Sequence, residues 1–419
     1  MSDFKVIPVG THLKLTSGFP FASAGFSNEG FPLIRIRDVL GSTTETYFKG
    51  TYPPGYVIRT GNILIGMDGD FHVVKWHGRD ALLNQRVLKV DVQDESAVVL
   101  DYVFHWLGLF IKKLNDVTAA TTVKHLSTKD IVKANARFPS VTGQRRIATI
   151  LTSIDTAIEK NEALIAKYQQ IKAGLMHDLF TRGVLPNGQL RPPRKQAPEL
   201  YQETVIGWIP REWKISDCAT EFATDSGITL GPHRRPKKRP HPYLRVANVH
   251  RDELRLDNVA HMEVVASEIE FSLKKQDLLV VEGHANRSEI GRCAMVNDDA
   301  RGMLFQNHLF RLRPNRMDSH YALFWMNSHH AQRYWEVTCS SSSGLNTINR
   351  RMLDRLLVLV PPIAEQQEIV SKGLCIKNML HAEQTKVRKL QEQKLGLMQD
   401  LLTGKVAVNV DAKVLEAAL

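Results

Sequence analysis

Two long stretches of the chain carry apolar residues at alternating spacings of four and three, the pattern of a coiled-coil helix. Between residues 143 and 182 this seam consists of Ile147, Leu151, Ile154, Ile158, Ile165, Tyr168, Leu175 and Leu179. Between residues 363 and 404 it consists of Ile369, Ile376, Leu380, Val387, Leu390, Leu397 and Leu401. Because each seam runs for about five heptads, which is longer than one domain face, we expect the two helices to pair as an antiparallel coiled coil.

Asn161 and Glu383 interrupt the two seams at matching positions. A polar residue in a seam can fix the register of a coiled coil at some cost in stability. The alternative is that both residues mark a hydrated point of the seam, and the sequence leaves these two roles open.

The remaining sequence predicts two globular domains, residues 1–142 and 206–362, each followed by one of the long helices. Short segments rich in Val, Ile, Leu and Phe indicate strands. They include FPLIRIRDV, GNILIGM and QRVLKVDV in the first domain, and HPYLRVANV, DLLVV and NHLFRLRP in the second. Helical stretches around 100–114 and 318–335 are expected to close the domains, so the fold class is mixed α/β (α+β) with an irregular sheet.

The chain contains an internal duplication. Residues 164–184 and 386–406 align without a gap at an offset of 222, and ten of the 21 positions are identical. Ser17-Gly18 matches Ser226-Gly227 at an offset of 209, and Gln85 is aligned with Gln306 at an offset of 221. Such a duplication predicts pseudo-two-fold symmetry, and symmetric DNA-binding proteins mirror the half-sites that they read.

Between the two halves, residues 183–205 are rich in proline, glycine and basic residues, and we expect a linker with little sheet or helix character. Residues 405–419 are expected to form a C-terminal tail. The net charge of +11 and the pI of about 9.4 favour a polyanionic partner. Four widely spaced cysteines, no apolar signal segment and no membrane-length apolar run predict a soluble, cytoplasmic protein.

The sequence lacks the motifs of several enzyme classes. It has neither a G-x-x-x-x-G-K-[ST] phosphate loop nor a G-x-S-x-G nucleophile elbow. His320 and His329-His330 are interpreted as helix surface residues rather than metal ligands. We therefore predict no catalytic residue, no metal site and no cofactor of its own for this chain.

Three motifs and their order along the chain give a resemblance to a known family. PPIAEQQEIV (361–370) begins the second helix, KLGLMQDLLTGKV (394–406) ends it, and KAGLMHDLFTRGV (172–184) ends the first copy. With IGWIPREWKI (206–215) opening the second half, the chain resembles the DNA-specificity subunit of Type I restriction-modification systems over essentially its whole length. It departs from the pattern at 139–144, where PSVTGQ stands in place of PPIAEQ.

The resemblance implies two target-recognition domains that each read one half of a bipartite, gapped double-stranded DNA sequence. The paired helices would act as a ruler that sets the gap. Two methyltransferase subunits would dock on them and bring S-adenosylmethionine, and two restriction and translocase subunits would bring ATP and Mg²⁺.

The basic loop 232–240 is the first candidate for DNA contact, because its prolines keep it out of helix and sheet. Its cations Arg234, Arg235, Lys237, Lys238 and Arg239 are predicted to contact phosphates, and the alternative is a merely solvated loop.

Other DNA-binding candidates lie on predicted strands and in polar loops. Arg35, Arg37 and Arg245 lie on predicted strands, where an arginine reads guanine or pairs with a buried carboxylate. Lys124-His125 and Asn346-Thr347 occupy matched positions in the loops TAATTVKHLS and SSSSGLNTIN, and Asn286 and Arg287 are further candidates for base contact. Gln85 and Gln306-Asn307-His308 are interpreted as structural residues at matched strand starts.

Two other function classes stay open at this point. One is a self-contained nucleic-acid-modifying enzyme with a diverged site, which would act without partners. The other is a coiled-coil adaptor that does not bind DNA, for which no salt-dependent DNA binding is expected.

Overall fold

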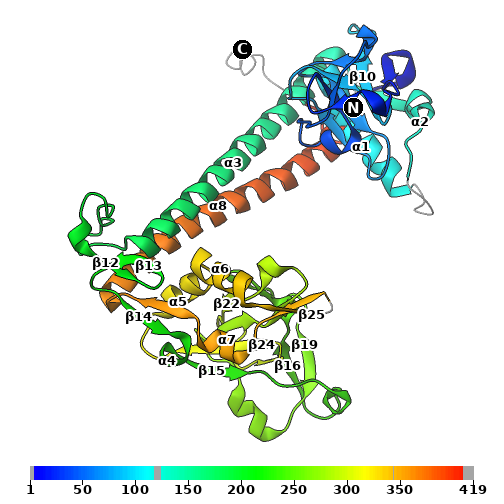
Figure 1. The fold of residues 1–419 in the computed structure, drawn as a ribbon. Coiled ribbons are helices and arrows are strands. Elements are labelled where there is room, and N and C mark those ends of the chain that lie inside the picture. Colours follow the sequence, from blue (N-terminus) through cyan, green and yellow to red (C-terminus); the bar gives the residue numbers. More distant parts are fainter. Residues whose placement is uncertain (1–3, 118–123, 343, 409–419) are drawn as a thin grey trace. The chain divides into compact units, whose positions relative to one another are not determined.

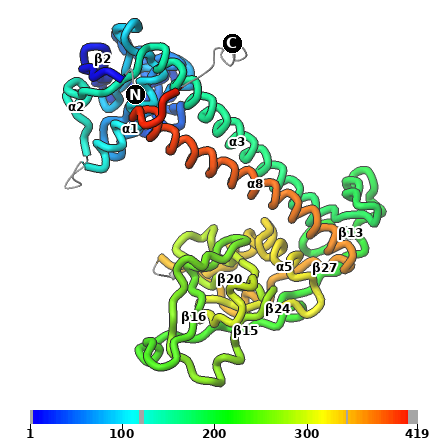
Figure 2. The backbone as a smooth tube through the Cα atoms, turned by 180° about the vertical axis from the view of Figure 1, so that it is seen from behind, coloured from blue at the N-terminus to red at the C-terminus, as the bar shows by residue number. Residues whose placement is uncertain are grey.

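A computed structural model describes residues 4–117, 124–342 and 344–408 of the chain. The chain divides into two compact units, Met1–Ala163 with Glu383–Leu419, and Leu164–Ala382. The long helices α3 (Val141–Thr181) and α8 (Ile363–Leu402) each contribute to both units. Figure 1 shows the fold with its elements labelled, and Figure 2 traces the backbone from behind.

Unit 1 holds the first globular domain. Its strands are β1 (Lys5–Pro8), β2 (Leu13–Ser17), β3 (Phe26–Ser27), β4 (Phe31–Ile34), β5 (Tyr47–Phe48), β6 (Val57–Ile58), β7 (Ile63–Gly66), β8 (Val73–Lys75), β9 (Ala81–Leu83), β10 (Val87–Val92) and β11 (Asn135–Phe138), with helices α1 (Leu100–Val117) and α2 (Thr128–Val132). They form sheets of order β2-β10-β7-β8, β3-β5-β4-β9-β6 and β1-β11.

Unit 2 holds the second globular domain. Its strands are β12 (Tyr201–Thr204), β13 (Gly207–Pro210), β14 (Lys214–Asp217), β15 (Phe222–Ser226), β16 (Pro240–Leu244), β17 (Val249–His250), β18 (Glu253–Leu254), β19 (Ala260–Glu263), β20 (Leu278–Val281), β21 (Gly283–His284), β22 (Cys293–Met295), β23 (Leu304–Phe305), β24 (Leu309–Pro314), β25 (Ser340–Ser342), β26 (Leu345–Thr347) and β27 (Leu357–Val360), with helices α4 (Cys218–Glu221), α5 (Ser319–Met326), α6 (His329–Thr338) and α7 (Arg350–Asp354).

The duplication extends to the sheets of the two domains. The sheet β15-β24-β20-β22 of unit 2 has the strand order of β2-β10-β7-β8 in unit 1, and the pair β14-β27 corresponds to β1-β11. Corresponding strands pair antiparallel in both sheets. The mixed α/β fold of two similar domains, each followed by a long helix, is therefore confirmed.

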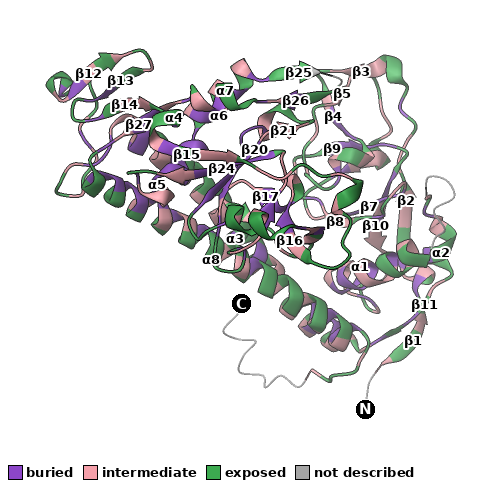
Figure 3. Ribbon diagram, turned by 90° about the horizontal axis from the view of Figure 1, so that it is seen from below, coloured by how far each residue is buried: buried purple, intermediate pink, exposed green. Residues whose placement is uncertain are grey.

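The two long helices run antiparallel within each unit. In unit 1, Ile147 near the start of α3 shares an apolar cluster with Leu401 near the end of α8. In unit 2, Leu179 near the end of α3 shares a cluster with Ile369 near the start of α8. All seam positions predicted from the sequence are buried or half-buried, while much of the remaining helix surface is exposed (Figure 3).

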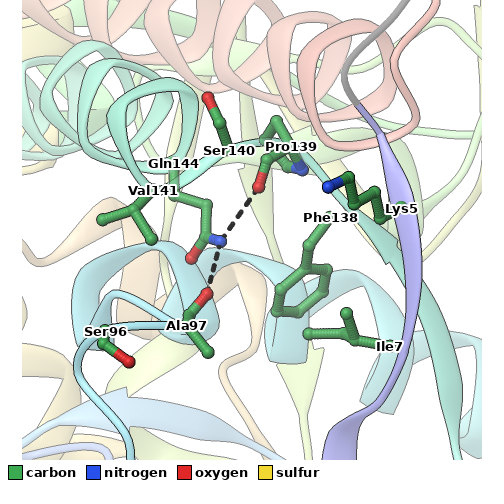
Figure 4. A pocket seen from close by; sticks show the side chains of 9 residues that line it. All are labelled: Lys5, Ile7, Ser96, Ala97, Phe138, Pro139, Ser140, Val141 and Gln144. Carbon is green, nitrogen blue, oxygen red and sulfur yellow. Dashed lines mark hydrogen bonds between the residues drawn. The ribbon is translucent and has the colours of Figure 1, made fainter.

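A buried glutamine ties the first turn of each long helix to the globular domain before it. The Gln144 side chain of α3 donates to Ala97 O at 3.0 Å and Pro139 O at 3.1 Å (Figure 4), and it accepts from Val99 N at 2.9 Å. At the matched position in α8, Gln366 donates to Pro361 O at 2.9 Å and accepts from Asp318 N at 2.9 Å. Both glutamine side chains are almost fully buried, and each joins the end of the preceding strand to the segment that leads into a shorter helix.

The residue before each glutamine differs between the halves, and unit 2 gains a buried ion pair from that difference. Gly143 precedes Gln144, whereas Glu365 precedes Gln366. The buried Glu365 carboxylate binds the Arg191 guanidinium, with Nη2 3.0 Å from Oε2, and accepts the backbone N–H of Val184 at 2.8 Å. The start of α8 therefore holds the chain segment that follows α3.

The predicted linker 183–205 is folded, which corrects the expectation of little regular structure. Residue 184 bridges residue 190, and β12 pairs with β13 in an antiparallel hairpin. Tyr201 is buried, and its hydroxyl donates to Pro192 O at 2.6 Å. The proline and glycine content of the segment indicated its turns but not the burial of Arg191 and Tyr201.

The helical stretch predicted around 318–335 is split into α5 and α6. The break lies at Asn327, whose side-chain amide donates to Cys293 O at 2.8 Å and to Asp252 Oδ1 at 2.6 Å. Ser328 then caps α6, because its hydroxyl accepts the backbone N–H of Ala331.

We call Gln144 and Gln366 the hub glutamines. Replacing either of them should destabilise the unit that contains it. We expect Gln144→Ala or Gln366→Ala to lower the free energy of unfolding by about 2–4 kcal/mol, because each removes the hydrogen bonds that a buried glutamine makes to backbone groups. Urea unfolding followed by tryptophan fluorescence measures the loss. Gln169→Ala, an exposed position on α3, is the control and should change stability by less than about 0.5 kcal/mol. A change equal to that of the control would contradict the role of the hubs.

The buried ion pair gives a second prediction. Glu365→Gln should destabilise unit 2 by about 3–5 kcal/mol, because it leaves the Arg191 charge buried without its main counter-ion. Glu212→Gln removes a carboxylate that lies 3.3 Å from the same guanidinium but is 55% exposed. This control should cost less than about 1 kcal/mol. Equal losses in the two variants, measured by urea unfolding, would show that burial does not decide the strength of the pair.

Candidate nucleic-acid interface

The basic loop of unit 2 has a defined conformation. Its first cation, Arg234, is held by the Glu268 carboxylate through bonds of 2.5 and 2.6 Å, and this pairing lowers the pKa of Glu268. The Arg234 side chain is only 17% exposed. Of the five cations predicted to contact phosphates, Arg234 therefore anchors the loop.

The other four cations of the loop face solvent. The Glu263 carboxylate accepts the backbone N–H groups of Lys237, Lys238 and Arg239 at 2.7, 3.0 and 2.9 Å, which lowers the pKa of Glu263. The backbone is thereby fixed around one carboxylate, and the three side chains and that of Arg235 are exposed. A fixed loop that displays four cations can contact successive phosphates.

Arg35, Arg37 and Arg245 do not lie on strands, which corrects the prediction. β4 ends at Ile34 and β16 ends at Leu244. The Asp38 carboxylate accepts the backbone N–H of Arg35 at 2.9 Å, and the Asn248 side-chain oxygen accepts the backbone N–H of Arg245 at 2.9 Å. These matched bonds cap the 3₁₀ helices η3 (Ile36–Asp38) and η7 (Val246–Asn248), which follow the two strands.

Several DNA-binding candidates in the two polar loops around residues 124 and 346 are hydrogen-bonded within the protein. The Lys124 ammonium donates to Asn115 O at 2.7 Å near the end of α1. The Asn346 amide is buried and donates to His284 O at 3.3 Å and Ala285 O at 2.9 Å. His125 is exposed, with Nδ1 2.6 Å from Asp68 Oδ1. Residues 118–123 of the first loop and Ser343 of the second lie outside the described residues.

Asn286 and Arg287 lie at a surface turn of the second domain. The Asn286 side chain accepts the Ser288 N–H at 3.1 Å and caps the short 3₁₀ helix Arg287–Glu289. Both residues are exposed. Asn286 therefore shapes the turn, and Arg287 faces solvent beside it.

A hollow in the first domain brings together residues that are distant in sequence. It measures 440 Å³ and is lined by Phe21, Ser23, Phe26, Arg35, Ile36, Asn84, Gln85 and Arg86. Arg35 thus lies beside Gln85, for which the sequence predicts a structural role, and beside Arg86, which is not among the predicted DNA-binding residues. The signal that could have found Arg86 is a polar tripeptide between two apolar strand segments.

The structure aligns residues 84–86 with the second half at an offset that differs by one residue from the offset predicted from the sequence. Phe19 N donates to Leu83 O at 2.9 Å, and Ile228 N donates to Phe305 O at 2.8 Å. The residue after Leu83, Asn84, therefore corresponds to Gln306, at the offset of 222 that also relates β10 to β24. The expected pairing of Gln85 with Gln306 is wrong, because the loop insertions end before this turn.

His329 and His330 begin α6 and line a 260 Å³ hollow of unit 2 with Lys172 and Arg251. Burial lowers the pKa of His330. Among the residues that the structure describes, no three His, Cys, Asp or Glu side chains gather in a metal-binding arrangement. Within those residues, no helix combines the length and the hydrophobicity needed to cross a membrane.

The chain is similar to DNA-specificity proteins of Type I restriction-modification systems. The family described as the Type I restriction modification DNA specificity domain matches residues 7–169. The specificity subunit of the Type I restriction enzyme EcoBI from Escherichia coli is 29% identical over 374 residues, which are 86% of this chain and 76% of that protein. The MjaVIII specificity subunit from Methanocaldococcus jannaschii is 21% identical over 97% of this chain and 93% of that protein.

Two solved structures share the fold. The crystal structure of a Type I restriction-modification S subunit from M. genitalium superposes with a TM-score of 0.58 at 12% identity, covering 98% of this chain and 97% of that one. A chain from a study of complex assembly and conformational transition of the Type I restriction-modification system gives a TM-score of 0.53 at 14% identity, covering 96% and 98%.

Proposed function

Because the chain is similar over most of its length to Type I restriction-modification DNA-specificity subunits, we propose that it is the non-catalytic DNA-binding subunit of such a complex. Each globular domain reads one half of a bipartite, gapped target in double-stranded DNA. The observation that carries this proposal is the duplication of one β framework with different exposed side chains in its two copies. Two copies of one framework suit a reader of two different half-sites.

The paired helices α3 and α8 set the length of the unread gap and offer docking surfaces to two methyltransferase subunits. Those subunits bring S-adenosylmethionine for adenine methylation. Two restriction and translocase subunits bring ATP and Mg²⁺ and complete the complex in the prokaryotic cytoplasm. Neither a self-contained enzyme nor a DNA-independent adaptor has an observation in its favour.

The methylome of the host tests the function directly. Deleting the gene should remove one gapped, two-part adenine-methylated motif, and restoring the gene should restore it. Replacing residues 1–140 with those of a related subunit should then change one half of the motif and leave the other half intact, because each domain reads alone. A methylome that the deletion leaves unaltered would contradict the function, and a change in both halves would contradict modular reading.

The exposed cations of the basic loop give a quantitative prediction for DNA binding. Replacing Lys237, Lys238 and Arg239 with alanine should reduce the slope of log K against log salt concentration by about 2.7, since each phosphate contact contributes about 0.9. Fluorescence anisotropy with duplex DNA over a salt series measures the slope.

A variant that removes the same charge elsewhere in the second domain is the control. Lys274, Lys275 and Arg301 are exposed, and their replacement with alanine should change the slope much less. Equal slopes for the two triple variants would show that net charge, rather than the loop, determines binding.

A further inference from the structure

The turn between β9 and β10 in unit 1 and the turn between β23 and β24 in unit 2 have the same backbone framework. Val87 N donates to Asn84 O at 2.9 Å, and at the matched positions Leu309 N donates to Gln306 O at 2.9 Å. Each bond closes a four-residue turn of the same kind. The two central residues of the turn are Gln85 and Arg86 in the first domain and Asn307 and His308 in the second.

A neighbouring strand end fixes the last residue of each turn. Met67 N donates to Arg86 O at 3.1 Å, and Glu282 N donates to His308 O at 3.0 Å. The same two strand ends also accept from the loops after α1 and α6, since Leu126 N donates to Met67 O at 2.8 Å. The corresponding bond in unit 2 runs from Ile348 N to Glu282 O at 2.9 Å.

A duplicated glycine allows another segment to approach each turn closely. A side chain at Gly18 would clash with Asn84 O, and one at Gly227 would clash with Gln306 O. This explains why the glycine is repeated in the two halves, and it shows that each turn is held from two sides.

The two turns present one cationic or titratable side chain each, at the same position and in the same setting. Arg86 Nη1 donates to Asp68 Oδ2 at 2.8 Å, and His308 Nδ1 lies 2.9 Å from Glu282 Oε2. Arg86 is 57% exposed and His308 is 53% exposed, whereas their carboxylate partners are 21% and 25% exposed. In both domains a half-buried carboxylate therefore orients a side chain whose far end faces solvent.

The carboxylates do not occupy matched positions, because Asp68 corresponds to Gly283 and Glu282 corresponds to Met67. The arrangement of an oriented side chain is thus retained although both partners differ between the halves. An exposed arginine that is oriented by one nitrogen keeps further N–H donors for a ligand. Such preorganisation is what specific recognition of a base edge requires.

We propose, on the basis of the function proposed above, that Arg86 and His308 are equivalent base-reading residues of the two half-sites. Arg86 donates to the O6 and N7 acceptors of a guanine in the major groove, and His308 contacts a base edge in the other half-site through Nε2. Asp68 and Glu282 are positioning residues that act through Arg86 and His308. Gln85 and Arg35 line the same hollow of the first domain as Arg86, and they lie beside the protein surface that we propose contacts DNA.

The test measures which base pair each variant stops reading. The full chain is co-expressed with the methyltransferase subunit of its own host, and the substrate is a plasmid library in which each half-site position is randomised in turn. Arg86→Ala should reduce discrimination at one base pair of one half-site by about 10- to 100-fold. His308→Ala should relax one position in the other half-site alone.

Two further variants separate reading from folding. Arg86→Lys keeps the charge but not the paired donors, so it should relax the same base pair as Arg86→Ala. Asp68→Asn should relax that base pair by a smaller factor while the unfolding midpoint stays unchanged. Continued reading of the second half-site shows that a first-domain variant is folded and assembled.

Arg59→Ala and His261→Ala are the matched controls, because both residues are exposed in the same two domains but lie outside the turns. Both should leave the motif as it is. An Arg86→Ala motif identical to that of the unmodified chain, or one relaxed in both halves, would overturn the proposal while leaving the subunit function standing. If the unmodified chain directs methylation to no gapped motif, the proposed function itself fails.

Discussion

The attachment of each long helix to its domain depends on one buried side chain. Gln144 and Gln366 lie in the first turn of α3 and α8, and each satisfies backbone groups of the preceding strand end and of the segment that leads into a shorter helix. A glutamine can donate and accept at once, so one residue fixes the direction in which the helix leaves the domain. Because the glutamine fixes this direction, the apolar seam of α3 contacts the seam of α8.

The two halves share this hub but differ in what surrounds it. In unit 2, Glu365 adds a charge that is compensated by Arg191, so the segment after α3 packs into the core with Trp213 and Phe180. In unit 1 the matched residue is Gly143, and the end of α8 packs through Leu401 and Leu402 instead. The same framework therefore accommodates either an ion pair or an apolar contact beside the helix start, because the glutamine bonds to matched backbone groups in both halves.

The same separation of framework and variable side chains holds at the candidate DNA surface. Backbone hydrogen bonds hold the turns at 84–86 and 306–308 in one geometry, and the side chains that leave those turns share no identity. Surface side chains contribute little to stability, so they are free to differ between the copies. A stable backbone that carries replaceable donors and acceptors is the physical basis on which two similar domains can recognise different sequences.

The sequence by itself determined the elements whose signals are periodic or local. The four-three seams predicted α3 and α8 within a few residues, and the basic loop was recognised from its prolines and charges. Only the tertiary structure decided that Arg234 is bound to Glu268, that Arg191 is buried, and that Arg86 lies beside Arg35. These contacts join residues 34, 174 and 51 positions apart. Side-chain pairing over such separations depends on how strands and loops meet in space, and a single sequence carries no local pattern for it.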